Sequence, residues 1–234
     1  MIDFTEAFRL AFNLIVKIDN GLSEIVILSL QISFAAVFIA SLIGLPIGAM
    51  LAIFRFPGRS IIVVMLNALM GLPPVVVGLI VYLLLSRSGP FGTLGLLFTP
   101  TAMIIAQVIL ITPIIAALTR QSISSLWFQY SDLFNSFGTG PLQTITTLLW
   151  DNKYSLVTIL LAGFGRAIAE VGAVMIVGGN IDHVTRVMTT AIALETSKGD
   201  LSLALGLGII LLIISLSVNI TAHLINEITL KPKK

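Results

Sequence analysis

Five long apolar stretches constrain this chain more than any other feature of its sequence. They cover residues 25–54, 60–86, 88–119, 154–181 and 201–225. Each is longer than the roughly 20 residues that a helix needs to cross a bilayer. We therefore expect an all-α integral membrane protein with five transmembrane helices, forming a single domain over residues 1–234.

The composition agrees with a membrane protein and excludes several other classes. Hydrophobic residues make up 57% of the chain and charged residues only 10%, whereas a soluble domain usually carries about 25% charged residues. The apolar runs are continuous, unlike the alternating strands of an outer-membrane barrel. The net charge of +2 gives no indication of nucleic-acid binding, and the lack of cysteine excludes disulfides and thiol chemistry.

Basic residues gather on one side of the five expected spans. That side receives Arg55, Arg59, Arg120, Lys153 and the C-terminal LKPKK, whereas the other side receives a balanced mixture of charges. Because cytoplasmic loops carry an excess of Lys and Arg, the pattern predicts a cytoplasmic C-terminus.

The N-terminal segment, residues 1–20, combines a helical apolar face with several charges. It is too short and too charged to span comfortably, so we expect an amphipathic helix lying along the outer surface. A sixth span or a re-entrant arrangement is the alternative.

Proline interrupts three of the expected spans. Pro46 and Pro113 predict kinks around which a bundle can pack. Pro73 and Pro74 fall near the middle of the second span and predict a break. Broken helices in transporters often line the substrate path, because backbone groups without an intrahelical partner must face protein or water. Pro73 and Pro74 are therefore pathway candidates.

The fourth span is the only one that carries charge inside its apolar run. Arg166 and Glu170 are four residues apart, so on a helix they share a face and can pair. A charge in the hydrocarbon region costs about 2.5–3.5 kcal/mol on insertion scales, so the pair requires a partner, a water-filled path or a function. A structural salt bridge and direct substrate contact are both open. Gly178 and Asn180, which follow this run, predict either a helix stop or backbone contacts to an anion.

The longest polar connection, residues 121–152, has the pattern of a helical hairpin. Ser131-Asp132 predicts the start of one short helix, and residues 138–141 predict a turn before a second. Its aromatic residues supply apolar surface: Trp127, Phe128, Tyr130, Phe134 and Phe137. That surface can bind a protein partner or enter the lipid headgroup region, and the pattern leaves both readings open.

Three segments resemble the permease subunits of ATP-binding-cassette (ABC) importers. Residues 132–138 (DLFNSFG) resemble a loop motif of Glu-Ala-Ala followed by Gly, with Leu133 and Phe134 in place of the alanines and without the closing Ile-x-Leu-Pro. LPPVVVGL (Leu72–Leu79) resembles the second-span signature of molybdate-type permeases. AGFGRAIAEVGAVMIVGGNI, with the TRVMTTAIALETSKGDL that follows, closely resembles tungstate importer permeases.

The resemblance implies the fold and the partners of a type I ABC importer of a prokaryotic cytoplasmic membrane. In that family a permease homodimer forms the pathway, two cytoplasmic ABC ATPase subunits bind its coupling loops, and an extracytoplasmic oxyanion-binding protein delivers tungstate. This chain has no GxxxxGK[ST] phosphate loop, so the partner ATPase would bind ATP and Mg, and no cofactor is expected here. The chain would be a transport subunit and not an enzyme.

The expected functional residues fall into two groups. The coupling residues are Asp132, Leu133, Phe134, Phe137 and Gly138. The pathway or gate candidates are Pro73, Pro74, Arg166, Glu170, Gly178 and Asn180. An ion pair whose charges offset makes a poor high-affinity anion site, which suits a transporter whose specificity resides in its binding protein. No catalytic or metal-binding residue is expected.

Other functions stay open at this stage. Importers of molybdate, sulfate and phosphate share the architecture, and tungstate and molybdate are dianions of nearly equal size. A secondary transporter or channel is a further alternative, although these usually show more intramembrane carboxylates than Glu170 alone. An intramembrane enzyme would need clustered nucleophiles or histidines, and the two histidines, His183 and His223, form no HExxH motif.

Overall fold

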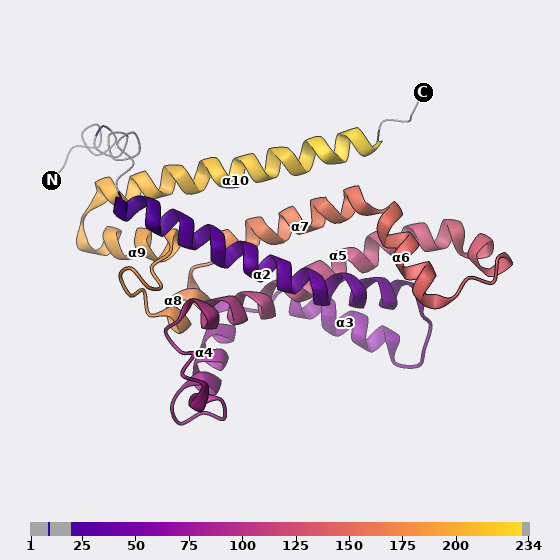
Figure 1. Ribbon diagram of the computed structural model, residues 1–234, viewed down its shortest axis with the longest axis horizontal. Coiled ribbons are helices and arrows are strands. Elements are labelled where there is room, and N and C mark those ends of the chain that lie inside the picture. The colour runs from indigo at the N-terminus through magenta and orange to yellow at the C-terminus, as the bar shows by residue number, and fades with distance from the viewer. Residues whose placement is uncertain (1–8, 10–19, 231–234) are drawn as a thin grey trace. The chain divides into compact units, whose positions relative to one another are not determined.

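The described part of the chain is helical and contains no strand (Figure 1). The computed structural model describes residue 9 and residues 20–230, so the expected amphipathic helix of residues 1–20 lies outside the described part. The helices are α2 (Asn20–Ile53), α3 (Arg59–Leu69), α4 (Pro74–Leu85), the 3-10 helix η1 (Gly92–Leu94), α5 (Pro100–Ser136), α6 (Pro141–Asp151), α7 (Lys153–Ile168), α8 (Gly172–Gly178), α9 (Met188–Lys198) and α10 (Leu201–Leu230). The predicted all-α class is confirmed.

Three of these helices are long and apolar enough to cross a membrane alone. They are α2, over Gly21–Ile53, α5, and α10, over Leu201–Ile225. The remaining two candidates are pairs of shorter helices, α3 with α4 and α7 with α8. Each pair is long enough only when its two helices are counted as one span, bent at a break of at most four residues. The described residues therefore contain three to five candidate spans, and the predicted five require each bent pair to count as one.

The third span begins later than the sequence predicts. Residues 88–119 carry no charge, but α5 starts only at Pro100. Before it the chain forms turns and η1, with Gly95 and Phe98 at a φ of 61°. Glycine and proline in this stretch favour turns over helix. The predicted start at residue 88 is wrong because a lack of charge does not distinguish an apolar turn from a helix.

Chain contacts divide the protein into two compact units. Within the described part of the chain, the first comprises the residues up to 36 with residues 73–107 and 165–217, and the second comprises residues 37–72, 108–164 and those from 218 onward. Four helices, α2, α5, α7 and α10, contribute residues to both units. The pathway candidates all lie in the first unit and the coupling candidates all lie in the second.

In the second unit, two glycines allow α2 to approach α5 closely. A Cβ on Gly44 would lie 2.9 Å from Cγ2 of Ile115, and a Cβ on Gly48 would lie 2.5 Å from the carbonyl oxygen of Ala116. Two small residues at this spacing are typical of close helix contacts in membranes. Pro46 and Pro113 lie inside these two helices, which continue on both sides of them.

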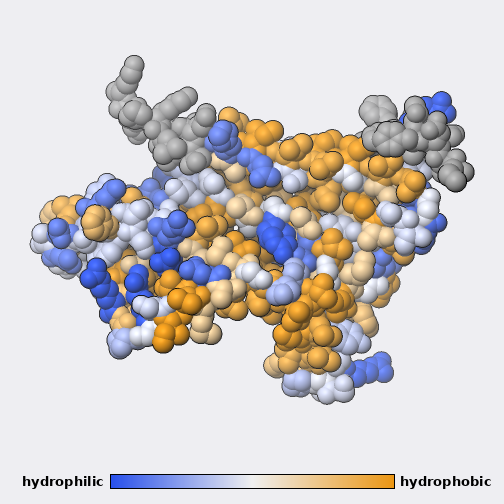
Figure 2. Space-filling view, turned by 180° about the vertical axis from the view of Figure 1, so that it is seen from behind, coloured by the Kyte–Doolittle hydropathy of each residue, from blue (hydrophilic) through white to orange (hydrophobic). Residues whose placement is uncertain are grey.

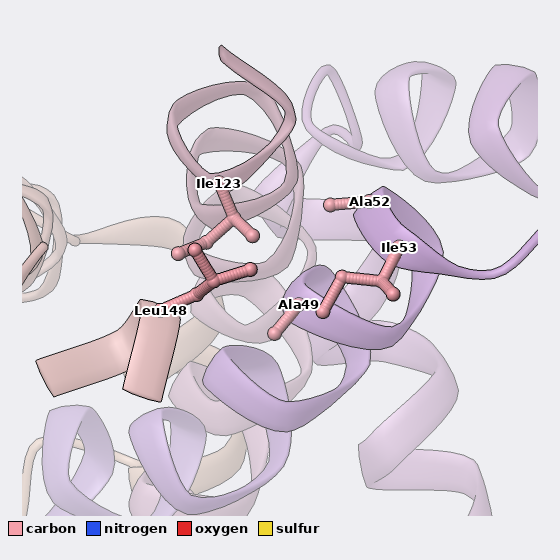
Figure 3. Packing of buried hydrophobic residues seen from close by; sticks show 5 residues of the cluster. All are labelled: Ala49, Ala52, Ile53, Ile123 and Leu148. Atoms are coloured by element: carbon pink, nitrogen blue, oxygen red, sulfur yellow. The ribbon is translucent and has the colours of Figure 1, made fainter. Parts of the chain in front are cut away.

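Further along, α2, α5 and α6 form a small apolar core (Figure 3). Figure 3 shows Ala49, Ala52 and Ile53 of α2 facing Ile123 of α5 and Leu148 of α6. Ile123 and Leu148 are fully buried. This core fixes the polar connection of residues 121–152 to the end of α2.

In the first unit, α4 packs directly against α8. A Cβ on Gly78 would lie 2.8 Å from Cα of Ala173, so the two backbones meet at this point. Hydrophobic side chains cover much of the face shown in Figure 2. Among the described residues, large exposed hydrophobic side chains include Phe34, Phe38 and Leu42 of α2. A surface of this kind is suited to lipid or to another membrane subunit.

Candidate functional site

The Arg166–Glu170 ion pair crosses a break in the fourth span. Nη1 of Arg166 lies 2.5 Å from Oε2 of Glu170, as the four-residue spacing predicts. The two residues do not share one continuous helix, however, because α7 ends at Ile168 and α8 begins at Gly172. Only 5% of the Glu170 side chain is exposed, against 38% of that of Arg166. The carboxylate is thus the buried partner, and the arginine is half-exposed.

Three further contacts hold Glu170 in this break. Its Oε1 accepts a hydrogen bond from the backbone N–H of Ala173, 3.2 Å away. Its carbonyl oxygen accepts one from the hydroxyl of Thr189, 2.7 Å away, at the start of α9. Its own N–H donates to the carbonyl of Ala167. Hydrogen bonds to both carboxylate oxygens offset the cost of burying the charge.

Gln107 of α5 approaches the same break from a second helix. Its Nε2 donates to the carbonyl of Ala167, 3.1 Å away, where α7 is about to end. Its Oε1 is buried and has no hydrogen-bond partner among the described residues. A cavity of about 10 Å³ adjoins it, with Ser29, Ser33, Glu170 and Thr189 among the polar lining residues. That volume is close to the least that holds one water molecule.

Gln107, Ser29 and Thr189 were not among the residues predicted from the sequence. Ser29 donates to the carbonyl of Ile25 and accepts from the N–H of Met188, 2.8 Å away, so it joins α2 to α9. For Ser29 and Gln107 the available signal was a polar residue inside a charge-free apolar run, which is costly unless it has a partner. That signal marks the residue but does not say which partner it finds.

The double proline forms the predicted break in the second span. Pro73 precedes α4, Pro74 is its first residue, and the carbonyl of Pro73 accepts the N–H groups of Val76 and Val77. A Cβ on Gly172 would lie 2.7 Å from Cγ2 of Val75 and 3.7 Å from Oε1 of Glu170. The structure therefore brings the start of α4 next to the break that holds Glu170.

Gly178 and Asn180 lie at the other end of α8. The helix ends at Gly178, and Gly179 and Asn180 follow in the left-handed conformation, with φ of 70° and 51°. The carbonyl of Gly178 accepts the hydroxyl of Thr185, 2.6 Å away. Among the readings that the sequence leaves open, the geometry is that of a helix stop.

In the predicted coupling segment, residues 121–152, only the second of the two predicted short helices is present. α5 continues without interruption to Ser136, so no helix begins at Ser131-Asp132, and that prediction is wrong. Trp127 and Phe134, two turns apart on one face of α5, pack against the core of Figure 3 and stack on each other, with ring centroids 6.2 Å apart. This packing favours a continuous helix over the local capping preference of Ser and Asp. The second predicted helix is present as α6.

The aromatic residues of this segment divide into two groups. Trp127 and Phe134 are partly buried, whereas Phe128 is 88% exposed and Phe137 is 74% exposed. Leu133 is 52% exposed, and Asp132 is exposed as well. The candidates Asp132, Leu133 and Phe137 therefore lie at the surface, while Phe134 fixes the segment from within.

Gly138 makes the turn between α5 and α6. Its φ is 62°, in the left-handed region that favours glycine, and its N–H donates to the carbonyl of Asn135. The next N–H, that of Thr139, donates to the carbonyl of Phe134. The turn leads through Gly140 to Pro141, the first residue of α6. The predicted turn is confirmed.

A charged cluster on the α8–α9 connection was not predicted. Nδ1 of His183 lies 2.7 Å from Oε2 of Glu24 in α2, and Nη1 of Arg186 lies 2.7 Å from Oδ1 of Asp182. The hydrogen bond to Glu24, with the negative charges of Glu24 and Asp182, raises the pKa of His183 above 6.5. Opposite charges this close favour the imidazolium form.

Comparison with known proteins decides the class. The family model described as "Binding-protein-dependent transport system inner membrane component" matches residues 44–229. The chain belongs to this family. The permease thus has the fold that the resemblance implies, and the arrangement described above is that of a membrane transport subunit.

Individual relatives of the permease are similar over nearly their whole length. It is 40% identical to the tungstate uptake system permease protein TupB of Peptoclostridium acidaminophilum, covering 95% of this chain and 97% of that protein. It is 36% identical to TupB of Campylobacter jejuni, covering 93% and 91%. It is 43% identical to a probable anion ABC transporter permease protein of Haloferax volcanii, covering 85% and 88%. The predicted resemblance to tungstate importer permeases is confirmed.

Proposed function

We propose that this permease forms the translocation pathway of an ABC importer for tungstate. The observation that carries the proposal is 36–40% identity to two tungstate uptake permeases over more than nine-tenths of each chain. The active assembly would be a permease homodimer with two cytoplasmic ATPase subunits and an extracytoplasmic binding protein. Basic residues gathered on one side of the spans support a cytoplasmic C-terminus.

The coupling of this importer would run through the turn between α5 and α6. Exposed apolar side chains such as Phe128, Leu133 and Phe137 would enter a groove of the ATPase, and Gly138 would set the direction of the turn. Burial of Trp127 and Phe134 in the core would transmit movement of this segment to α2. Closure of the ATPase dimer on ATP would thereby change the access of the pathway.

The pathway of this importer would pass the breaks at Pro73-Pro74 and Glu170. Irregular backbone at membrane depth is tolerated where it faces protein or water, which supports this placement. Arg166 would attract the dianion, while the paired charge of Glu170 would keep that attraction weak enough for release. Gly178 and Asn180 would shape the outer end of the fourth span. Selection of the oxyanion would reside in the binding protein.

Reconstitution of the complex in vesicles tests the proposal. The permease, its ATPase and its binding protein are assembled with ATP inside, and uptake of tungstate, molybdate and sulfate is compared. We expect tungstate uptake that stops when either ATP or the binding protein is omitted. Uptake that persists without the ATPase would establish a secondary transporter or channel. Faster uptake of molybdate or sulfate than of tungstate would overturn the substrate while leaving the class intact.

A further inference from the structure

The short connection between α2 and α3 carries two arginines at a membrane boundary. The apolar span of α2 ends at Ile53, and α3 begins at Arg59. Arg55 is exposed and Arg59 is half-buried. Both arginines therefore closely follow the end of a candidate membrane-spanning helix, where we expect lipid headgroups.

Arg59 holds this connection in place. Its Nε donates to the carbonyl of Leu51, 2.7 Å away. Leu51 belongs to the last turn of α2, whose carbonyls have no partner within the helix. Gly58, with a φ of 88°, turns the chain into α3. Arg59 thus acts as a positioning residue, and Arg55 is the more exposed cation.

One side of Arg55 adjoins an apolar groove in the second unit. The groove has a volume of about 520 Å³ and lies between the end of α2 and the start of α3. Besides Arg55, it is lined by Ile47, Met50, Leu51, Phe54, Phe56 and Ile62. Ile62 and Phe56 are 42% and 41% exposed, so this part of the lining is accessible from outside. Apart from Arg55 the lining is apolar, which fits a hydrocarbon chain.

The other side of Arg55 adjoins a polar pocket. This pocket has a volume of about 630 Å³, and its polar lining residues are Arg55, Arg59, Ser124, Ser131, Asn135, Thr139 and Thr144. The hydroxyl of Ser124 is buried and has no hydrogen-bond partner within the described part of the chain. Guanidinium, hydroxyl and amide groups are the usual donors to a phosphate.

We propose that an anionic phospholipid binds here, with its phosphate against Arg55 and Arg59 and an acyl chain in the apolar groove. Phe54 and Arg55 line both cavities, so one amphipathic molecule can occupy the two at once. Free phosphate would use only the polar pocket, and an acidic segment of the ATPase would leave the apolar groove empty. The charge and the adjoining groove together therefore favour a lipid.

Native mass spectrometry of the full-length permease tests this proposal without any transport measurement. The protein is exposed to equal amounts of phosphatidylglycerol and phosphatidylcholine, and the ratio of bound lipids is measured. We expect the preference for phosphatidylglycerol to fall about fivefold in Arg55→Gln, the loss of one cation near an anionic lipid. The matched control is Lys153→Gln, whose ammonium lies over the Trp150 ring at 4.7 Å, and it should retain the preference. Ile62→Asn should weaken binding of phosphatidylglycerol by reducing the apolar groove.

Three outcomes would overturn the proposal. An unchanged lipid preference in Arg55→Gln would place anionic lipid elsewhere. Displacement of phosphatidylglycerol by equimolar inorganic phosphate would show that the site binds a phosphate ion and not a lipid. Loss of ATPase association in Arg55→Gln, with lipid binding intact, would assign the arginine to the protein partner. Because binding is measured on the permease alone, none of these results depends on which anion is transported.

Discussion

Every polar atom of Glu170 has a hydrogen-bond or ion-pair partner within the chain. One carboxylate oxygen faces Arg166, the other accepts from Ala173, and its backbone groups bond to Ala167 and Thr189. A buried group with this many partners is costly to disturb, because each partner that is removed leaves another polar atom unsatisfied. The residue therefore holds the α7–α8 break as well as the charge of Arg166.

Removing Arg166 alone should destabilise the permease more than removing both charges. Arg166→Met leaves a buried carboxylate without its cation, and we expect a loss of about 1–3 kcal/mol in the free energy of unfolding. Adding Glu170→Gln removes that charge and keeps an oxygen for the N–H of Ala173, so stability should partly return. Thermal unfolding of the purified variants measures this. If the double variant is as unstable as the single one, and uptake falls equally in both, Arg166 acts directly on the anion.

The contact between His183 and Glu24 should make the outer connection sensitive to pH. Because Glu24 raises the pKa of His183, the stabilisation is fully present below about 6.5 and is lost as the pH rises through the higher folded-state value. The melting temperature of the native permease should therefore fall towards that of His183→Gln as the pH rises. Glu24→Gln should remove most of this difference, because only the weaker attraction of Asp182 then favours the charged form of His183. A difference that grows with pH would contradict the assignment.

Helix breaks were predictable only where the breaking residue acts locally. Pro73 and Pro74 predict the break in the second span, because proline lacks an N–H and disfavours helix in the residue before it. The break at Glu170 contains no proline, and contacts from Gln107 and Thr189, distant in sequence, hold it. The spacing of Arg166 and Glu170 therefore predicted the ion pair correctly but not the break in the span.

The same limit explains the error in the coupling segment. Ser131-Asp132 has the local chemistry of a helix start, yet α5 continues through it to Ser136. The burial of Trp127 and Phe134 against α2 and α6 stabilises the continuous helix. A local sequence pattern carries no information about these contacts. In contrast, the turn at Gly138 was predictable because glycine itself permits the left-handed conformation.

The close packing of α2 against α5 can be tested by substituting a glycine at their contact. A Cβ on Gly48 would lie 2.5 Å from the carbonyl oxygen of Ala116, so Gly48→Ala must separate the two helices. We expect a loss of about 1–3 kcal/mol in the free energy of unfolding, as for overpacked cores. Gly208→Ala is the control, because nothing lies within 4 Å of its Cβ position. Denaturant unfolding of the two variants in detergent provides the comparison, and equal stability would show that α2 and α5 do not pack this closely.

The two groups of candidate residues, those of the pathway and those of the coupling segment, fall in different compact units of the molecule. The pathway candidates belong to residues 73–107 and 165–217, and the coupling candidates belong to residues 108–164. Four helices contribute to both units and provide continuous backbone between them. Because the two groups belong to different units, we expect a change confined to the proposed coupling turn to reduce transport without altering the contacts around Glu170.

Gly138→Val tests this separation. Valine strongly disfavours a φ of 62°, so the turn between α5 and α6 must change direction, although nothing within 4 Å obstructs the new side chain. Membrane insertion should stay normal, while ATPase co-purification and ATP-driven uptake should each fall at least about tenfold, as for a contact worth some 1.4 kcal/mol or more. The control is Gly140→Val, two residues away, where φ is −68° and the surrounding space is equally open. Because valine adopts that conformation without strain, the control should bind the ATPase and transport normally. Equal loss in both variants would mean that added bulk, and not the direction of the turn, blocks the ATPase; normal coupling in Gly138→Val would place the coupling contact elsewhere on the chain.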